Sequence, residues 1–306
     1  MSAAHGTPEW MRRAERGSQF WLRVMSRLSL ALGRRVSRIV LYGIALYFLF
    51  AAPAARRASR RYLARCLGRE PSWIDQYRHM LAFASTIHDR IYLLCDRHDL
   101  FDIRSSGLEP LSRLNGEEHR GCLLFGAHLG SFEVLRAVAR EDRRIRVSLA
   151  MYPDNAARIN QTLAAINPRA RPDIIALGRA ESILAVHHRL VEGTMVGILA
   201  DRALRSDQDQ EVDFLGAPAR FPLGPFRLAA MLRQPAYFMA GLYRGGRRYE
   251  VHFELLADPS LPKTEPDREA QAQALLQRYV AALERHCRAA PYNWFNFYDF
   301  WGDLGR

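Results

Sequence analysis

Lysine is almost absent from this sequence. Lys263 is the only one, although the 306-residue chain carries a net charge of +12. The positive charge therefore comes from arginine, whose guanidinium stays charged and can bind phosphate through two hydrogen bonds. Acidic residues are scarce in one region: residues 1–65 hold 13 arginines against Glu9 and Glu15. Nearly all of the net charge thus belongs to the N-terminal segment.

Cysteine is also rare, and the four cysteines form no CxxC pair. They are Cys66, Cys95, Cys122 and Cys287. This spacing excludes a zinc ribbon or a disulfide scaffold and indicates a reducing compartment. Cys122 lies in an apolar run, which favours a core position over a role as nucleophile.

Several catalytic motifs are missing. The sequence has no GxSxG, no GxxxxGK[ST], no HExxH and no GxGxxG after a strand-like run. These absences count against a serine hydrolase, a P-loop nucleotide hydrolase, a zinc protease and a dinucleotide-binding domain. The hydrophobic content of 49% is ample for a packed core. We expect a membrane-associating segment at residues 1–65 and an α/β catalytic domain at residues 66–306.

Two features occupy the basic N-terminal segment. Residues 10–33 repeat apolar side chains every three to four positions with arginines between them, which is typical of an amphipathic helix with a basic face. Residues 39–55 follow, 17 residues without a charge and with arginines on both flanks. A helix of that length spans about 25 Å, short of the roughly 30 Å hydrocarbon core. Arginines on both sides also give no orientation under the positive-inside rule.

We therefore expect a helix that lies in the membrane interface or dips into one leaflet, since arginines beside aromatic residues suit an anionic lipid surface. A buried core helix with arginines at its ends is the alternative. Nucleic-acid binding is disfavoured, because RNA-binding arms rarely contain so long an uncharged run.

The rest of the chain alternates short apolar runs with helical patterns. The predicted strands are residues 122–127, 146–152, 173–177 and 195–201, with a hairpin of 236–243 and 249–256 around Gly245 and Gly246. The predicted helices are residues 70–102, 132–140, 156–166, 181–191 and 267–290. This alternation indicates βαβ units, and hence an α/β fold with a mostly parallel mixed sheet flanked by helices.

His128 is the main catalytic candidate. It follows the apolar run CLLFGA, between Gly126 and Gly130, and Glu133 stands five positions later. In open α/β sheets, ligands collect beyond the carboxyl ends of the strands, where this loop lies. A turn of the loop can bring imidazole and carboxylate together, so that Glu133 orients His128 while the other ring nitrogen takes a proton from a hydroxyl. A structural histidine bonded to the backbone is the alternative.

The same spacing occurs at His187 and Glu192, inside a predicted helix. Positions five apart on a helix are about 140° apart around its axis, so these side chains diverge. We therefore expect His187 at the surface or at the boundary of the core.

Three stretches together resemble the bacterial lipid A late acyltransferases, the lauroyl and myristoyl transferases of the lysophospholipid acyltransferase superfamily. They are GAHLGSFE (126–133), ILADRALRSDQDQEVDFLGAPARFPLGPFRLAAMLRQPAYF (198–238) and PYNWFNFYDFW (291–301). The resemblance implies a glycerol-3-phosphate acyltransferase-like fold with a hydrophobic N-terminal membrane segment. It also implies O-transfer of a fatty acyl chain from a thioester to a hydroxyl of a membrane lipid, at the cytoplasmic face of the bacterial inner membrane.

By this resemblance His128 is the base and Glu133 its partner, with no metal and no cofactor besides the thioester co-substrate. The implied substrate-binding residues are Gly130, Ser131, Arg171, Asp201 and Arg202, with Arg169 as the alternative to Arg171. Acyl carrier protein, which is acidic, is the favoured donor over coenzyme A. We expect FPLGPFRLAAML (221–232) to join the N-terminal segment in offering apolar surface to the acyl chain, with a plain core helix as the alternative.

The sequence also departs from the family pattern. DRALRSDQD stands where the family typically has DQDxG, and an aromatic tail replaces a tryptophan followed by basic residues. These differences resemble a branch associated with aryl-polyene gene clusters, which leaves the acceptor open between a lipid A-like molecule and a related glycolipid. A non-catalytic, membrane-bound accessory protein of a lipid or polyene biosynthetic complex is the alternative function.

Overall fold

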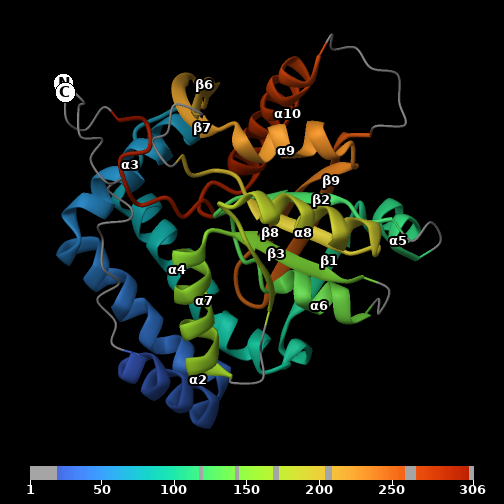
Figure 1. The fold of residues 1–306 in the computed structure, drawn as a ribbon. Coiled ribbons are helices and arrows are strands. Elements are labelled where there is room, and N and C mark those ends of the chain that lie inside the picture. Colours follow the sequence, from blue (N-terminus) through green and yellow to red (C-terminus); the bar gives the residue numbers. More distant parts are fainter. Residues whose placement is uncertain are drawn as a thin grey trace, which may run out of the picture.

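A seven-stranded sheet forms the centre of the computed structural model, which describes residues 19–116, 120–141, 145–167, 172–203, 209–258 and 267–302 (Figure 1). The strand order is β1-β9-β8-β2-β5-β3-β4. The strands are β1 (Asp102–Ser106), β2 (Leu123–Gly126), β3 (Val147–Met151), β4 (Asp173–Ala176), β5 (Met195–Leu199), β8 (Ala236–Tyr243) and β9 (Arg248–Ala257). Within this sheet, β8 and β9 pair antiparallel and the other neighbours pair parallel. The predicted α/β fold with a mostly parallel mixed sheet is confirmed.

The predicted hairpin is β8–β9, and its turn holds Gly245 and Gly246 at φ of +87° and +63°. A second hairpin, β6 (Asp209–Phe214) and β7 (Ala217–Pro222), forms a separate two-stranded sheet that the sequence patterns did not predict. Its turn residues Leu215 and Gly216 lie at φ of +52° and +76°. Leucine is uncommon at a positive φ, so this turn lacks the usual Asn-Gly or Asp-Gly signal.

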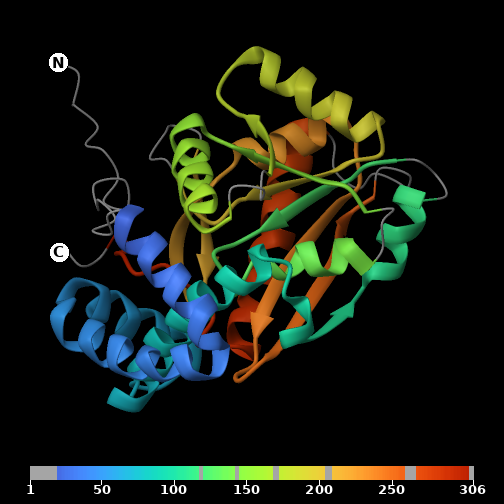
Figure 2. The ribbon, with the colours of Figure 1, turned by 90° about the horizontal axis from the view of Figure 1, so that it is seen from below.

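Helices cover both faces and one end of the sheet (Figures 1 and 2). They are α2 (Gln19–Ala51), α3 (Pro53–Leu67), α4 (Trp73–Leu94), the short η1 (His98–Leu100), α5 (Leu108–Gly116), α6 (Val134–Glu141), α7 (Pro153–Ile166), α8 (Ala180–Val191), α9 (Gly224–Leu232) and α10 (Arg268–Ala289). The helix predicted at residues 70–102 is shorter than expected. α4 ends at Leu94, and the last predicted residues belong to η1 and to the start of β1.

The core alternates along β2 as the pleat of a strand requires. Leu123 and Phe125 belong to the apolar cluster with α8, α9 and α10, whereas Cys122 and Leu124 belong to the cluster with α5 and α6. Cys122 is fully buried, which confirms its predicted core position.

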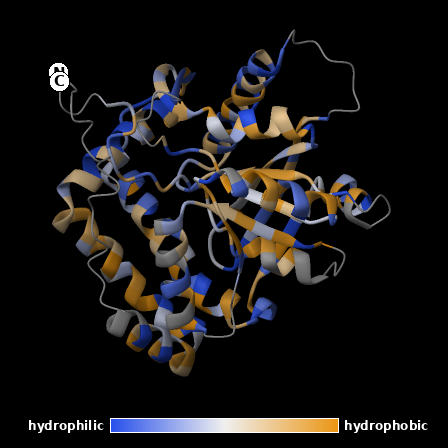
Figure 3. Ribbon diagram, viewed as in Figure 1, coloured by the Kyte–Doolittle hydropathy of each residue, from blue (hydrophilic) through white to orange (hydrophobic). Residues whose placement is uncertain are grey.

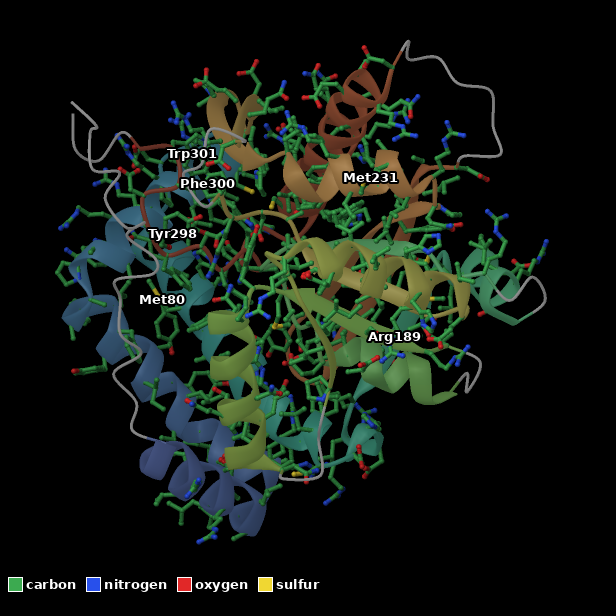
Figure 4. The ribbon with its side chains drawn as sticks, viewed as in Figure 1. Met80, Arg189, Met231, Tyr298, Phe300 and Trp301 are labelled. Carbon is green, nitrogen blue, oxygen red and sulfur yellow. The ribbon has the colours of Figure 1, made fainter. Side chains whose placement is uncertain are left out.

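The stretch predicted to offer apolar surface at residues 221–232 contributes chiefly to the core. Phe221 and Phe226 are both fully buried, and the Phe226 ring lies 4.8 Å from that of Phe125. Met231, on the outer side of α9, is 38% exposed (Figure 4). The core-helix alternative therefore describes most of this stretch.

The N-terminal helices α2 and α3, with α4, form a layer at one end of the sheet (Figures 1 and 2). α2 begins inside the amphipathic helix predicted at residues 10–33 (residues 1–18 lie outside the described part) and breaks at Gly33, where φ is 76°. None of the described helices alone is long and apolar enough to cross a bilayer; α2 and α3 reach the required length and apolar composition only together, across a bend of 96°. The membrane segment thus stays a prediction.

The inner side of α2 is polar in its first part and apolar in its last part. Ser37 Oγ lies 2.8 Å from His88 Nε2, and Tyr92 donates to the carbonyl of Ser29 at 2.6 Å, whereas Leu41, Ala45 and Leu49 are buried. The other side of α2 is apolar and open to solvent, and Figure 3 shows hydrophobic residues along it. We call this side the outer face of α2: Val36, Ile39, Val40, Tyr42, Leu46, Tyr47, Phe48 and Phe50, each 49% to 67% exposed.

Candidate active site

The loop that carries His128 lies at the carboxyl edge of the sheet. β2 ends at Gly126 and pairs in parallel with β5, with Gly126 opposite Leu199. Because neighbouring parallel strands end at the same edge, the residues just after each strand meet there. His128 follows β2 and Asp201 follows β5, so the register itself brings these two residues together.

Asp201 accepts four hydrogen bonds, and His128 supplies two of them. The His128 ring Nδ1 lies 2.8 Å from Asp201 Oδ1, and the His128 backbone N–H donates to Oδ2 at 3.0 Å. Trp294 Nε1 and Asn296 Nδ2 donate to the same Oδ2 at 3.1 and 2.9 Å. The carboxylate is fully buried, and these contacts leave it one orientation.

This geometry determines the tautomer of His128. Burial alone would raise the pKa of Asp201, but the His128 ring, its backbone N–H and the nearby Arg202 guanidinium outweigh burial and hold the pKa below its usual value. An ionised carboxylate can only accept, so Nδ1 carries the ring proton and Nε2 has the free lone pair. The His128 side chain is 28% exposed, so a reactant can reach the imidazole.

The imidazole is also kept neutral. Burial lowers the pKa of His128, and the Arg202 and Arg90 guanidinium groups lower it further, against the opposing charge of Asp201. A neutral imidazole with its Nε2 lone pair free is the form that accepts a proton.

Glu133 is not the partner of His128, and the predicted pairing is wrong. Its Oε1 lies 2.6 Å from Arg90 Nε on α4, and its Oε2 accepts from Ser131 Oγ at 3.1 Å. No hydrogen bond or ion pair joins Glu133 to His128, two residues that the structure describes fully. The reason is the loop geometry: the loop places His128 against the end of β5, while Glu133, in the turn just before α6, lies against α4.

Gly130 and Ser131 hold the loop against β8. Gly130 has φ of +73°, and a Cβ there would lie 2.0 Å from the carbonyl oxygen of Gly241. Ser131 is 2% exposed, and its N–H donates to that same Gly241 oxygen at 2.7 Å. Both residues therefore have a structural reason to be where they are, and their predicted contact with substrate stays a prediction.

Arg202 lies beside the dyad of His128 and Asp201. Its Nε donates to Asn296 Oδ1 at 2.8 Å, and its guanidinium carbon lies 5.8 Å from the centre of the Tyr298 ring. The other predicted arginine, Arg171, and its alternative Arg169 lie outside the described residues. The competing pair behaves as expected: His187 is exposed on α8, and Glu192 instead lies 3.3 Å from His188.

The sequence patterns missed the role of the C-terminal tail, residues 291–302. Besides its two bonds to Asp201, the tail makes two backbone hydrogen bonds to the His128 loop. Phe295 N donates to His128 O at 2.7 Å, and Asn293 O accepts from Gly130 N at 2.8 Å. Farther along the tail, Trp301 Nε1 donates to Phe214 O. Figure 4 shows Tyr298, Phe300 and Trp301 beside α3. Six aromatic residues among Trp294–Trp301 were the available signal, since such a segment must bury its rings somewhere.

In the part of the chain that the structure describes, no group of three or more His, Cys, Asp and Glu side chains is placed to hold a metal ion. The site thus consists of a neutral imidazole, a buried carboxylate that orients it, and arginines that add positive charge.

A model of the bacterial lipid A biosynthesis acyltransferases matches residues 9–302. The chain belongs to this family. The match covers the loop of His128, Asp201 and the whole tail, so the dyad lies within the region that matches the family. A comparison with curated proteins gave no significant match.

Membership of this family shows that the protein is an acyltransferase that acts on lipid. The match does not distinguish branches of the family, so the aryl-polyene branch remains a prediction. The donor, the acceptor and the O-acyl specificity also remain predictions.

Proposed function

We propose that this lipid A acyltransferase family member transfers a fatty acyl chain from an acyl thioester to a hydroxyl of a lipid A-like or related glycolipid acceptor. The observation that carries the proposal is the neutral, accessible imidazole of His128, whose Nδ1–H is bound by the buried carboxylate of Asp201. This leaves Nε2 as a base for an alcohol, and no protein nucleophile is needed.

The proposed reaction has two proton movements. Nε2 takes the proton of the acceptor hydroxyl as its oxygen attacks the thioester carbonyl, and Asp201 stabilises the imidazolium that forms. Arg202, beside the dyad, supplies positive charge for the developing oxyanion. The carbon–sulfur bond then breaks, and the thiol leaves with the proton held on Nε2, which restores the neutral imidazole.

The test compares His128→Ala with His187→Ala, a surface histidine that has the same HxxxxE spacing. Both variants are assayed for transfer of a radiolabelled lauroyl group from acyl carrier protein, and from coenzyme A, to the lipids of isolated bacterial membranes. We expect His128→Ala to lose about 10²- to 10⁴-fold in turnover, because a positioned base contributes that much, while His187→Ala keeps full activity.

Full turnover in folded His128→Ala would contradict the base role. Absence of transfer in the wild-type protein with both donors would favour the non-catalytic accessory function instead. The ratio of the two donor rates tests our preference for acyl carrier protein, whose acidic surface suits the arginines of α3.

We propose further that the enzyme works at the cytoplasmic face of the bacterial inner membrane, with the outer face of α2 in one leaflet. Two observations support an interfacial position. α2 packs on the body through Leu41, Ala45 and Leu49, which recur every fourth residue and are each at most 5% exposed. Its opposite side is apolar, as a surface in contact with lipid should be.

Flotation with vesicles that contain anionic lipid tests this position. The double variant Ile39→Asp with Leu46→Asp places two charges on the outer face of α2. We expect membrane binding to fall about 100-fold or more, because two buried aliphatic side chains together contribute at least about 3 kcal/mol. The matched control is Leu184→Asp on α8, a residue that is 70% exposed but lies away from α2. Equal flotation of the double variant and the wild type would contradict the proposal.

A further inference from the structure

Asn296 occupies a position between the two charged residues at the end of β5. Asp201 and Arg202 are adjacent in sequence and opposite in charge, and the side chain of Asn296 contacts both. Its Nδ2 donates to Asp201 Oδ2 at 2.9 Å, and its Oδ1 accepts from Arg202 Nε at 2.8 Å. Asn296 is 2% exposed, so this arrangement is enclosed by the protein.

The amide suits this place because its two ends differ. An NH₂ group can serve only as donor to the carboxylate, and the amide oxygen can serve only as acceptor from the guanidinium. A guanidinium and a carboxylate in a largely enclosed site attract strongly and form two parallel hydrogen bonds when they meet. The Asn296 amide lies between Asp201 and Arg202 and makes one hydrogen bond to each of them.

The separation matters for the dyad. An Arg202 guanidinium bound directly to Asp201 would compete with His128 for the carboxylate and would neutralise the charge that orients the imidazole. Tyr298, two residues after Asn296 along the tail, holds the same guanidinium from a second direction, with its ring centre 5.8 Å from the guanidinium carbon. Two positions of the tail thus contact Arg202.

We propose that Asn296 is a positioning residue that keeps Arg202 off Asp201, so that the carboxylate serves the imidazole and the guanidinium serves the entering acyl donor. The proposal rests on the proposed function for the second half of this statement only; the first half concerns the resting protein. Asn296 acts through Asp201 and Arg202 and needs no contact with substrate.

The charged groups that act on His128 are Asp201, Arg202 and, from α4, Arg90. Changes at Asn296 should therefore move the titration of His128 in opposite directions. In Asn296→Ala, Arg202 reaches Asp201 and neutralises its field, so His128 should titrate at lower pH. In the isosteric Asn296→Asp, a second carboxylate stabilises the imidazolium, and we expect a rise of about one pH unit.

Asn293 provides the matched control. It lies in the same tail, is 3% exposed, and its amide accepts from Tyr243 N at 2.7 Å and donates to Tyr243 O at 3.1 Å. Its side-chain bonds are thus confined to the backbone of β8, and its only bond to the His128 loop, from Gly130 N to Asn293 O, is a backbone bond that the substitution keeps. Asn293→Ala should lower stability and leave the titration of His128 unchanged.

The experiment uses the full chain in detergent and the rate at which diethyl pyrocarbonate modifies His128, followed by peptide mass spectrometry between pH 4.5 and 8.5. The reagent reacts with neutral imidazole, so the midpoint reports the titration without any acyl transfer. We expect a lower midpoint in Asn296→Ala, a higher one in Asn296→Asp, and the wild-type midpoint in Asn293→Ala.

In the double variant of Asn296→Ala with Arg202→Gln, the midpoint of His128 should move part of the way back toward the wild-type value, because the guanidinium that neutralises Asp201 is then absent. Wild-type midpoints in both Asn296 variants would overturn the proposal, as would shifts of the same sign. If Asn296→Ala does not fold, Asn296→Ser takes its place, because the shorter hydroxyl side chain can still donate to Asp201 but offers Arg202 no amide oxygen; the midpoint should again fall, and a wild-type midpoint would overturn the proposal. Enzyme kinetics test the link to catalysis. The KM for lauroyl acyl carrier protein should rise in Asn296→Ala and not in Asn293→Ala. An unchanged KM in Asn296→Ala, together with the expected midpoint shifts, would refute the contact of Arg202 with the donor but not the role of Asn296 in the resting protein.

Discussion

Two fully buried aspartates, one in each layer of the molecule, differ in the partner that the fold gives them. Asp89 on α4 receives two hydrogen bonds from Arg34 of α2, both 2.8 Å long, and a third from Tyr249 at 2.8 Å. Asp201 at the sheet edge receives its bonds from His128 and from two neutral tail residues. Both carboxylates are 0% exposed.

The difference lies in whether the partner can exchange a proton. A guanidinium stays charged at any pH that proteins encounter, so the pair of Asp89 and Arg34 holds α2 on α4. His88 also lies near Asp89, but its Nδ1 is 3.6 Å from Asp89 Oδ1 and makes no hydrogen bond to it. An imidazole gains and loses a proton near neutral pH, so the same carboxylate beside His128 can support chemistry. A buried aspartate is therefore structural or functional according to its partner, and the following changes test that distinction.

The largest effect should come from Asp201→Asn. The amide cannot stabilise imidazolium and no longer enforces the tautomer with a proton on Nδ1. We expect kcat to fall about 10³- to 10⁴-fold, as in other sites where an orienting carboxylate is replaced by an amide. Initial rates of lauroyl transfer measure this. Activity within tenfold of the wild type would show that Asp201 does not serve the base.

Asp89→Asn should reduce stability instead. It leaves the Arg34 guanidinium, whose side chain is 10% exposed, without its counter-ion. Breaking a buried pair in this way costs about 3–5 kcal/mol of unfolding free energy. Denaturant titration checks this value, with Asp99→Asn as the control because Asp99 pairs with Arg97 on an exposed surface. A loss as small as that of the control would remove the structural role of the pair.

His79 sharpens the comparison, because its ring nitrogens contact uncharged partners. Nδ1 lies 2.8 Å from Ser59 Oγ and Nε2 lies 2.9 Å from Trp294 O. Burial lowers the pKa of His79 to about 4. Between pH 6.5 and 4 the unfolded chain binds a proton here that the folded chain does not, so stability falls as the pH is lowered.

The integrated loss at pH 4 is about 3 kcal/mol from this residue. Thermal unfolding across this range should therefore depend less on pH in His79→Asn than in the wild type. An unchanged slope would mean that His79 titrates normally in the folded protein.

The smallest effect is expected from Glu133→Gln. Glu133 pairs with Arg90 and not with the imidazole, so its amide variant should lose less than about tenfold in kcat, roughly the 1.4 kcal/mol of a modest electrostatic change. With the negative charge gone, Arg90 acts on His128 without compensation, and the acidic limb of the rate profile should move to lower pH. A loss equal to that of Asp201→Asn would show that Glu133 contacts the imidazole during turnover.

Much of the fold could be predicted from local patterns. Runs such as residues 122–127 and 195–201 show strands, and the helical stretches between them show parallel connections, because each signal lies within a few neighbouring residues. The hairpin of β6 and β7 could not be predicted in this way, because its turn has Leu215 at a position where glycine or asparagine is the usual signal of a hairpin.

The site was predicted only in part, for a related reason. The position of His128 after a strand is a local feature, whereas its partner depends on which strands are neighbours. Nothing within residues 122–134 indicates that β5 lies beside β2, so the nearer acid, Glu133, was chosen over Asp201, which is 73 residues away. Asn296 is more distant still, and its bonds follow from how the tail packs.

The chain supplies the hydrogen-bond partners of Asp201 at widely separated times during synthesis. Trp294 and Asn296 leave the ribosome after Asp201, with Trp294 93 residues behind it, which is about 5–20 s of synthesis at ordinary rates. The apolar side of α2 emerges long before either. In a nascent chain the apolar side of α2 is thus exposed while Asp201 still lacks two of its four hydrogen bonds, and the carboxylate that orients His128 is fully enclosed only after the tail has been translated.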